Sequence, residues 1–409
     1  MNGRGIVLVS DLDIGGAAIS CGRLRRGLAL SCDLPIEWVA ARGRGDREAC
    51  VLESCPGVTT AVLRWVTRTV GWSHRAARVD QAVVDRAMAK AVRDRLPRVV
   101  NLHNIHEAMS VRLLDRLPTG CPIVWTLHDM WPLTGSCSYS YGCEKYLDGC
   151  NGECPEGSGN ETDRSLGWRR REAFFKANSA RMAIVCPSRW LAQCARKRLG
   201  GGVRVECIPY SIDTNVFRPL GTPRECRRLL SLPDKPVILA GSQLPGERRK
   251  GISVLADAVA RMRGRMGDSF SVVVFGNYRE ALELPADWNL RGTICDEELL
   301  NIYYNCADAF VLPSYADNLP NTLLEATAAG VPSVTFAVGG CTDIIRDGQN
   351  GLVARPGDPV DLAACMERAL AMGTDAWNDM RKKCRSIATK EYALDRQARR
   401  YLELFGELQ

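Results

Sequence analysis

Short apolar segments recur along the whole chain, and each is followed by a turn and a helical pattern. This alternation is typical of parallel βαβ units. Between the two halves, residues 208–223 break the periodicity with three prolines, and we interpret them as an interdomain linker. The sequence therefore predicts two α/β domains. The clearest predicted strands are residues 5–10, 99–103, 122–128, 182–188, 237–242, 270–277, 308–314 and 332–336.

The predicted N-terminal Rossmann-like domain covers residues 1–212, and the C-terminal one covers residues 213–389. A final helix, residues 390–409, has one apolar face and is expected to pack back onto the first domain. Two doubly wound parallel sheets facing each other would leave a cleft at the carboxyl ends of their strands, where open α/β folds bind ligands. The apolar face of the final helix consists of Ala398, Tyr401, Leu402, Phe405 and Leu408.

Composition and charge narrow the class of protein. With 46% hydrophobic and 25% charged residues, the chain has the composition of a soluble globular protein. The first apolar run is too short for a signal peptide, and no run approaches the roughly 18 residues of a membrane span. We therefore expect a cytoplasmic protein. The sequence shows no signature of nucleic-acid binding.

The net charge of +7 gathers in two stretches, residues 64–98 and 168–176. Such stretches could contact anionic lipid at the inner face of the membrane, or they could be ordinary solvated helix faces.

Four of the 18 cysteines lie close together in a loop rich in Gly, Ser and Tyr: Cys137, Cys143, Cys150 and Cys154. In a reducing cytosol most cysteines are small buried hydrophobes rather than disulfide partners. Four neighbouring thiolates, however, can surround a tetrahedral Zn²⁺ and order a loop that builds no core of its own. The spacing lacks paired CxxC knuckles. Free thiols and a redox pair therefore remain alternatives to structural zinc.

Residues 317–325, DNLPNTLLE, follow a predicted strand and carry two carboxylates, Asp317 and Glu325. Pro320 suits a first helical turn, so the free N–H groups of Asn321 and Thr322 would face a phosphate at the strand ends. The two acids could then accept hydrogen bonds from sugar hydroxyls. Alternatively, Thr322 and Glu325 form a capping box and Asp317 is a turn residue.

Two further turns follow predicted strands. Residues 248–250 deliver Arg248, Arg249 and Lys250 to the start of a helix, where Lys250 would suit a diphosphate, although a solvated basic turn is the alternative. Gly15 and Gly16 follow the first strand, where bare backbone can approach a phosphate or simply form a tight turn. The pattern is not GxGxxG, which disfavours a nicotinamide dehydrogenase.

Histidines end two predicted strands. His128 ends one strand, while His103 and His106 follow the preceding strand in the sequence NLHNIH. Histidines satisfied by loop packing are common, but two strand ends with histidine favour a polar ligand. Asp11 and Asp13 look like a metal-binding DxD motif, but their place at the end of the first strand argues against that role.

Taken together, these segments resemble the retaining glycosyltransferases of family four, which have the GT-B architecture. The resemblance covers nearly the whole chain and is most similar to bacterial exopolysaccharide transferases, including the cysteine-bearing loop. It is carried by the ordered segments DIGGAA, NLHNIH, TLHDMWPLTG, CPSRWLA, IPYSIDTNVFRP, RRKG, LPSYADNLPNTLLEATAAGVPSV, VGGCTDII and NGLVARPGD.

The resemblance implies a role for each site residue. Glu325 would hold the nucleotide ribose, Asp317 the donor sugar, and His128 would lie beside that sugar near the reacting carbon. The diphosphate would be bound by Lys250, by Asn318, Asn321 and Thr322, and by Gly15 and Gly16. Such enzymes need no metal for catalysis because cations and a helix end stabilise the leaving group.

This chain departs from the family pattern at several positions. The first acid is Asp317 rather than Glu, and Pro320 lacks the N–H of a more usual glycine. Ser242 and Gln243 stand where the family often has an arginine, so Arg248 or Arg249 is expected to substitute.

The expected reaction transfers a sugar from a nucleotide-diphosphate sugar to a hydroxyl of a glycan, a lipid-linked glycan or a small molecule, with retained configuration, in bacterial polysaccharide or glycoconjugate biosynthesis. A non-hydrolysing sugar-nucleotide epimerase of similar fold and a non-catalytic scaffold built on a zinc loop are the alternatives.

Overall fold

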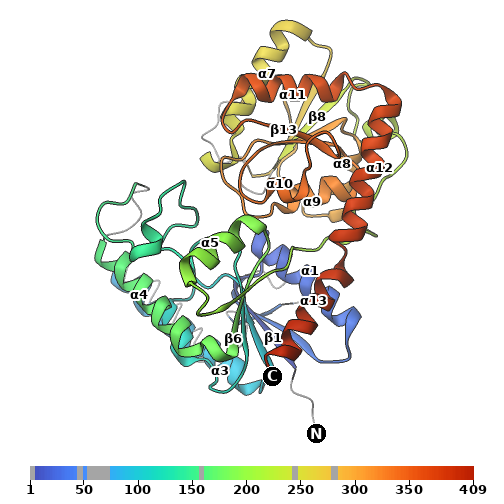
Figure 1. Cartoon of the computed structure of the whole chain (residues 1–409). Helices are drawn as coiled ribbons and strands as arrows, with labels where there is room; N and C mark the ends of the chain where they lie inside the picture. Colours follow the sequence, from blue (N-terminus) through green and yellow to red (C-terminus); the bar gives the residue numbers. More distant parts are fainter. Residues whose placement is uncertain (1–4, 44–48, 53–73, 156–160, 242–246, 278–283) are drawn as a thin grey trace. The chain divides into compact units, whose positions relative to one another are not determined.

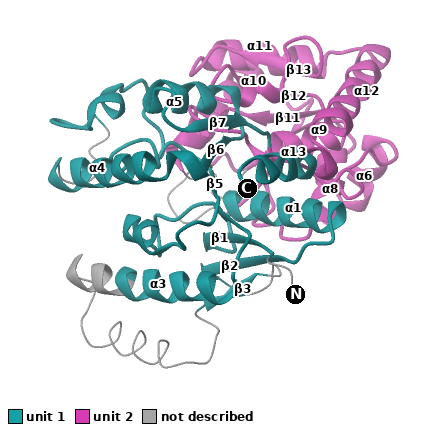
Figure 2. Cartoon of the chain, turned by 60° about the horizontal axis from the view of Figure 1, so that its bottom comes forward, with its two compact units in different colours: residues 1–209, 397–409 teal, residues 210–396 magenta. Residues whose placement is uncertain are grey.

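The computed structural model describes residues 5–43, 49–52, 74–155, 161–241, 247–277 and 284–409, with backbone alone for 74–80 (Figure 1). The chain divides into two compact units (Figure 2). Unit 1 is Met1–Pro209 with Gln397–Gln409, and unit 2 is Tyr210–Arg396. Each unit contains one sheet, of seven strands in unit 1 and six in unit 2, in which every described pairing is parallel. The predicted α/β class with two doubly wound sheets is confirmed.

The sheet of unit 1 has the strand order β3-β2-β1-β4-β5-β6-β7. The order reverses between the neighbours β1 and β4, which makes their carboxyl ends the topological switch point of this sheet. The strands are β1 (Ile6–Leu12), β2 (Ile36–Arg42), β3 (Cys50–Val51), β4 (Val99–Leu102), β5 (Ile123–Thr126), β6 (Met182–Cys186) and β7 (Arg204–Cys207).

Helices cover both faces of this sheet, because alternate side chains of each strand point to opposite sides. Val7 and Val9 of β1 pack in one core with α3, α4 and α5. Ile6 and Leu8 pack in a second core with α1 and α13. The helices are α1 (Gly16–Ser31), α3 (His74–Asp94), α4 (Glu161–Asn178), α5 (Arg189–Leu199) and α13 (Leu394–Glu407).

The sheet of unit 2 has the order β10-β9-β8-β11-β12-β13, so its switch point lies between β8 and β11. Val237 and Leu239 face a core with α8 and α9, while Ile238 and Ala240 face a core with α7 and α11. The strands are β8 (Val237–Gly241), β9 (Ser271–Phe275), β10 (Asn289–Leu290), β11 (Ala309–Leu312), β12 (Ser333–Phe336) and β13 (Gly351–Ala354). The helices are α6 (Pro223–Leu229), α7 (Ile252–Met266), α8 (Glu297–Asn305), α9 (Asn321–Ala328), α10 (Cys341–Ile344), α11 (Pro359–Leu370) and α12 (Thr374–Glu391).

The segment interpreted as a linker is largely part of unit 2. The boundary between the units falls after Pro209. Beyond it, Tyr210, Ile212 and Phe217 are buried in the unit 2 core. The prolines therefore interrupt the secondary structure, but this segment stays packed on unit 2 because its apolar side chains are buried there.

Helix α13 returns to unit 1, where Ala398, Tyr401, Leu404 and Phe405 are buried against α1 and the sheet. The Tyr401 hydroxyl lies 2.8 Å from Thr126 Oγ1 at the end of β5. Of the predicted apolar face, Leu402 and Leu408 are only partly buried, and Leu404 was not predicted.

No helix in the described part of the chain is long and apolar enough to cross a membrane. Within the basic stretch 64–98, residues 64–73 lie outside the described residues. On α3, Arg86, Lys90 and Arg93 are exposed, and their spacing places them along one face of the helix.

Candidate functional site

In unit 2, three predicted site residues meet at the switch point of the sheet. Lys250 follows β8, and its Nζ lies 2.6 Å from Oδ2 of Asp317, which follows β11. Arg249 Nη1 lies 3.4 Å from the same oxygen and donates a hydrogen bond to the Ala316 carbonyl over 2.9 Å. Arg248 is exposed, so the structure brings Arg249 and not Arg248 to this carboxylate. Ser242 and Gln243 lie outside the described residues.

The charge of Asp317 is set by these neighbours. Burial alone would raise the pKa of the carboxyl, but Lys250 and Arg249 outweigh burial and hold the pKa below its ordinary value. Asp317 is therefore ionised at neutral pH. The Asp317 carboxylate holds Lys250 and Arg249 at the carboxyl ends of the strands, where an open α/β fold binds its ligand.

Two glycines allow the chain to close around this carboxylate. Gly339 has φ of 49°, and a Cβ there would lie 1.8 Å from the Asp317 carbonyl oxygen. Gly251 has φ of 68°, and a Cβ there would lie 1.9 Å from the Pro313 carbonyl oxygen. Both positions require glycine for backbone conformation and for space. They were missed as site residues, although the segments RRKG and VGGCTDII contain them.

Glu325 lies buried on α9, where its Oε2 accepts a hydrogen bond of 2.8 Å from the Tyr304 hydroxyl on α8. The capping-box interpretation is wrong. Helix α9 begins at Asn321 with Pro320 as its N-cap residue and no side-chain cap, so Thr322 is inside the helix. Asn321 and Thr322 are the first two residues of the helix, and Pro320, predicted to lie in the first helical turn, is its N-cap residue. Asn318 is buried in the loop before it.

In unit 1, two of the predicted histidines touch each other. His128 follows β5, and its Nε2 lies 2.8 Å from Nδ1 of His103, which follows β4. Burial lowers the pKa of His103 to about 3 and lowers that of His128 as well, and in His128 the neighbouring His103 adds to the effect. Both rings are therefore neutral at pH 7, and one donates to the other.

His106 lies in a different electrostatic environment. Its Nε2 is 3.3 Å from Oδ2 of Asp129. Burial opposes the charged form, but Asp129, Asp11 and Glu107 together raise the pKa of His106. The His106 ring also stacks on Trp131 with centroids 4.9 Å apart.

Asp11 supports the same turn from the end of β1. Its carboxylate accepts backbone N–H groups of Glu107 at 2.5 Å and Met109 at 2.9 Å. Burial raises its pKa to about 6. Asp11, within the last residues of β1, thus fixes the loop that carries His106.

Gly15 and Gly16 lie between β1 and α1. Gly15 has φ of 98° and ψ of 173°, a conformation open to glycine alone. Gly16 is the first residue of α1. The turn therefore brings bare backbone to the switch point of unit 1, beside the ends of β1 and β4.

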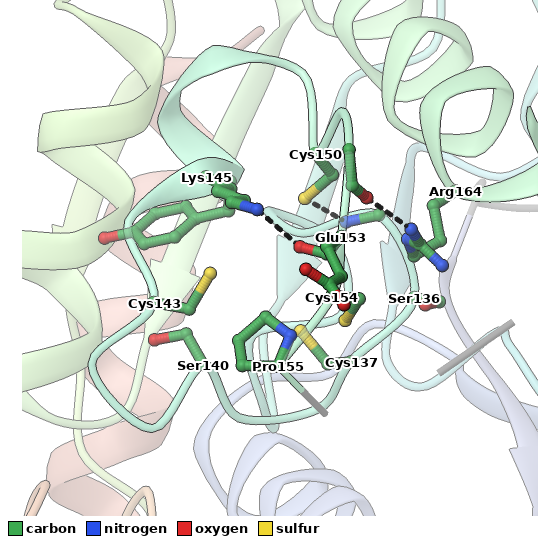
Figure 3. A pocket seen from close by; sticks show the side chains of 13 residues that line it. Ser136, Cys137, Ser140, Cys143, Lys145, Cys150, Glu153, Cys154, Pro155 and Arg164 are labelled. Carbon is green, nitrogen blue, oxygen red and sulfur yellow. Dashed lines mark hydrogen bonds between the residues drawn. The ribbon is translucent and has the colours of Figure 1, made fainter. Parts of the chain in front are cut away.

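The four clustered cysteines line one pocket in the loop between β5 and α4 (Figure 3). All four are free and half-buried. The Gly135 N–H donates a hydrogen bond of 3.1 Å to Cys150 Sγ. Burial raises the pKa of the Cys137 thiol, and Cys150 and Cys154 raise it further, since the thiols lie near one another. Among the described residues, no group of three or more His, Cys, Asp or Glu side chains already has the arrangement that holds a metal ion.

Two doubly wound units with polar and charged side chains at their switch points define a GT-B protein. Residues 14–216 match the family model described as glycosyltransferase family 4, and residues 235–372 match the model described as glycosyl transferases group 1. The chain belongs to the family-four glycosyltransferases.

Similar curated proteins include the D-inositol 3-phosphate glycosyltransferase of Stackebrandtia nassauensis, 32% identical over 192 residues, or 42% of each chain. The putative colanic acid biosynthesis glycosyl transferase WcaC of Escherichia coli K12 is 26% identical over 251 residues, covering 58% of this chain and 59% of WcaC. The chain thus spans about half the length of the curated relatives it matches.

Solved structures share the fold across almost the whole chain. Sucrose-phosphate synthase from Thermosynechococcus elongatus is 18% identical with a TM-score of 0.73, over 99% of both chains. Anabaena HepE in complex with UDP-glucose is 14% identical with a TM-score of 0.67, over 99% of this chain and 100% of HepE.

Proposed function

We propose that this protein is a glycosyltransferase that moves a sugar from a nucleotide-diphosphate sugar to an acceptor hydroxyl, with retention of configuration. The observation that carries the proposal is the meeting of Lys250 and Asp317 at the switch point of unit 2, over 2.6 Å. A cation suited to a diphosphate and a carboxylate suited to sugar hydroxyls are the two groups that a nucleotide-sugar donor requires.

Glu325 and the N-terminus of α9 complete the donor site. Glu325 would accept hydrogen bonds from the ribose hydroxyls, as the carboxylate of a dinucleotide fold does. Asn321 and Thr322 at the start of α9 would present backbone N–H groups and the positive helix end to the diphosphate. The donor nucleotide would therefore be held by unit 2, and the UDP-glucose named for HepE supports a nucleotide-sugar donor.

The chemistry follows from stabilising the leaving group. As the bond between the anomeric carbon and the phosphate oxygen breaks, Lys250 and Arg249 would balance the negative charge on the departing diphosphate. The acceptor hydroxyl would attack on the same face and give its proton to the departing phosphate oxygen. His128, neutral because it is buried, would offer the donor sugar a hydrogen bond without a competing charge. No step of this route uses a catalytic metal.

The biological setting is proposed from the relatives. WcaC is named for colanic acid biosynthesis, and a phosphatidylinositol monomannoside mannosyltransferase of Mycolicibacterium smegmatis is 27% identical over 251 residues. A polysaccharide or glycolipid acceptor would suit both. A lipid-linked acceptor would also give the basic face of α3 a use at an anionic membrane.

The deciding experiment is a screen of nucleotide-diphosphate sugars by thermal shift, followed by assays with and without acceptor. A donor that binds raises Tm through mass action. Transfer predicts that free nucleotide accumulates only when an acceptor hydroxyl is added. Sugar-nucleotide interconversion without any acceptor would instead establish the epimerase, and the absence of binding by every donor would support the scaffold.

A further inference from the structure

The loop between β5 and α4 contains little regular secondary structure. Among residues 134–155, only the 3₁₀ turn Lys145–Asp148 is regular, and Tyr146 is the principal apolar side chain buried in the core. Loops longer than about 12–15 residues without secondary structure are uncommon and are usually functional or disordered. The four half-buried cysteines are drawn from both ends of the loop and line a single pocket, as Figure 3 shows.

The surroundings of these thiols suit a metal–thiolate centre. Four thiolates around Zn²⁺ carry an excess of negative charge, and the pocket is also lined by the cations Lys145 and Arg164. The Gly135 N–H already donates to Cys150 Sγ over 3.1 Å, as backbone amides do around ligating groups. The four thiols do not have the arrangement that holds a metal ion, so binding would require the Sγ atoms to move closer together.

The loop is connected to the histidine turn through one buried arginine. Arg171 on α4 donates hydrogen bonds to the Thr134 and Gly135 carbonyls. Its guanidinium carbon lies 4.2 Å from the centroid of the Trp131 ring. Trp131 in turn stacks on His106. An ordered cysteine loop therefore fixes the carbonyls that hold Arg171, and Arg171 fixes the ring against which His106 rests.

We infer that Cys137, Cys143, Cys150 and Cys154 bind one structural Zn²⁺, which orders this loop and thereby positions His106 through Arg171 and Trp131. Four cysteine thiolates are the ligand set of closed tetrahedral zinc sites and also of iron–sulfur clusters, so iron in place of zinc would overturn the inference. Zinc binding here is independent of the transfer reaction, and nothing in the donor site of unit 2 requires it.

The first test is elemental analysis of the purified full-length protein that has never met a chelator. About one zinc per chain is expected for a four-thiolate site. The single variants Cys143→Ser and Cys154→Ser should lose that zinc. Cys295→Ser, an exposed cysteine of unit 2, is the matched control and should keep it. Wild-type protein with less than about a tenth of one zinc per chain, or with a disulfide between two of the four cysteines, would overturn the inference.

A second measurement examines the connection to His106. The chain has only four histidines, so their imidazole NMR signals can be followed individually. In Cys154→Ser the His106 signal should move or broaden, while UDP binding by unit 2 stays close to that of wild type. An unchanged His106 signal in zinc-free protein would refute the positioning role. Loss of UDP binding in both variants but not in the control would place the cysteines in the donor site, contrary to the inference.

Discussion

The Tyr304 hydroxyl on α8 donates a hydrogen bond of 2.8 Å to Glu325 on α9, with both side chains buried. This contact holds the carboxylate in one orientation, inside α9 and five residues after its N-cap residue Pro320. Glu325 is therefore fixed by tertiary packing, as a ligand-binding carboxylate must be. The contribution of Glu325 to nucleotide binding can be measured separately from that of Tyr304.

Glu325→Gln is expected to weaken nucleotide-diphosphate binding by roughly 1.5 to 3 kcal/mol, on the order of ten- to a hundredfold. Glutamine can still accept the Tyr304 hydrogen bond, so the fold should be kept, but the charge that would hold ribose hydroxyls is lost. Isothermal titration calorimetry with the nucleotide measures the change. Wild-type affinity in this variant would reduce Glu325 to a structural residue.

Tyr304→Phe tests the hydrogen bond that orients Glu325 rather than the proposed contact between Glu325 and the nucleotide. Losing one buried hydrogen bond should cost about 1 kcal/mol of the free energy of unfolding, and nucleotide affinity should fall less than in Glu325→Gln. Urea unfolding and calorimetry provide the two values. Tyr303→Phe, at the neighbouring position of α8, is the matched control. An affinity loss in the control as large as in Tyr304→Phe would argue against a specific Tyr304–Glu325 contact.

Asp317→Asn should reduce turnover about tenfold or more, because a charge-assisted hydrogen bond to the donor sugar is lost. It should also lower the free energy of unfolding by about 3 kcal/mol, since Lys250 and Arg249 lose their carboxylate partner. Affinity for the nucleotide alone should stay close to wild type. Steady-state kinetics compared with calorimetry separate these effects, and full turnover in the variant would contradict the proposed contact.

The buried histidine pair predicts a pH dependence of stability. His103 has a folded pKa of about 3, below its ordinary value of 6.5. The free energy of unfolding that neutral, buried His103 contributes is therefore fully present above pH 6.5. It is lost as pH falls towards 3, because the histidine of the unfolded chain takes up a proton at higher pH than the buried one. The loss is about 1.4 kcal/mol per pH unit, roughly 2 kcal/mol between pH 6.5 and 5.

Urea unfolding of wild type and His103→Gln at both pH values checks this expectation. Carboxylates that titrate in the same window affect both proteins equally, so the difference between the two slopes reports on His103, with its neighbour His128 still present. Parallel pH profiles would show that His103 is not buried in its neutral form.

The exposed basic face of α3 should bind anionic membranes. Each basic residue near an anionic surface contributes about 1 kcal/mol, so the double change Arg86→Gln with Lys90→Gln should cut vesicle binding roughly thirtyfold at low salt. Sedimentation with anionic vesicles at low and high salt measures it. Lys382→Gln with Lys383→Gln, on α12, is the control pair. Equal binding to neutral and anionic vesicles would remove the electrostatic basis of the prediction.

The strands that sequence patterns identified are buried on both faces, but the largely buried β2 and β13 were not among them. β1, β5, β8 and β11 are nearly unbroken apolar runs, and the turns that follow them carry most of the candidate site. β7, with the sequence RVEC, is mostly half-exposed and gives no such run, and β3 and β10 have only two residues each. These edge strands are recognised only by their pairing with a neighbouring strand, so the local sequence does not reveal them.

Local sequence patterns also do not reveal contacts between segments that are far apart in the chain. Thr322 and Glu325 have the spacing of a capping box, but α9 begins two residues earlier than that box would place it, which a local pattern cannot decide. Arg171 lies in a basic run interpreted as lipid-facing or solvated, yet it is buried against Trp131. Tyr304 carries no local signal, because its importance arises only when α8 packs beside α9.

The return of α13 to unit 1 gives the chain an order of assembly. Ile6 and Leu8, close to the first residue, share a core with Tyr401 and Phe405, close to the last. A ribosome delivers the whole of unit 2 before it delivers those two aromatic rings. The second unit can therefore finish folding during synthesis, while the first must wait, with one face of its sheet covered only in part by α1, until α13 leaves the exit tunnel.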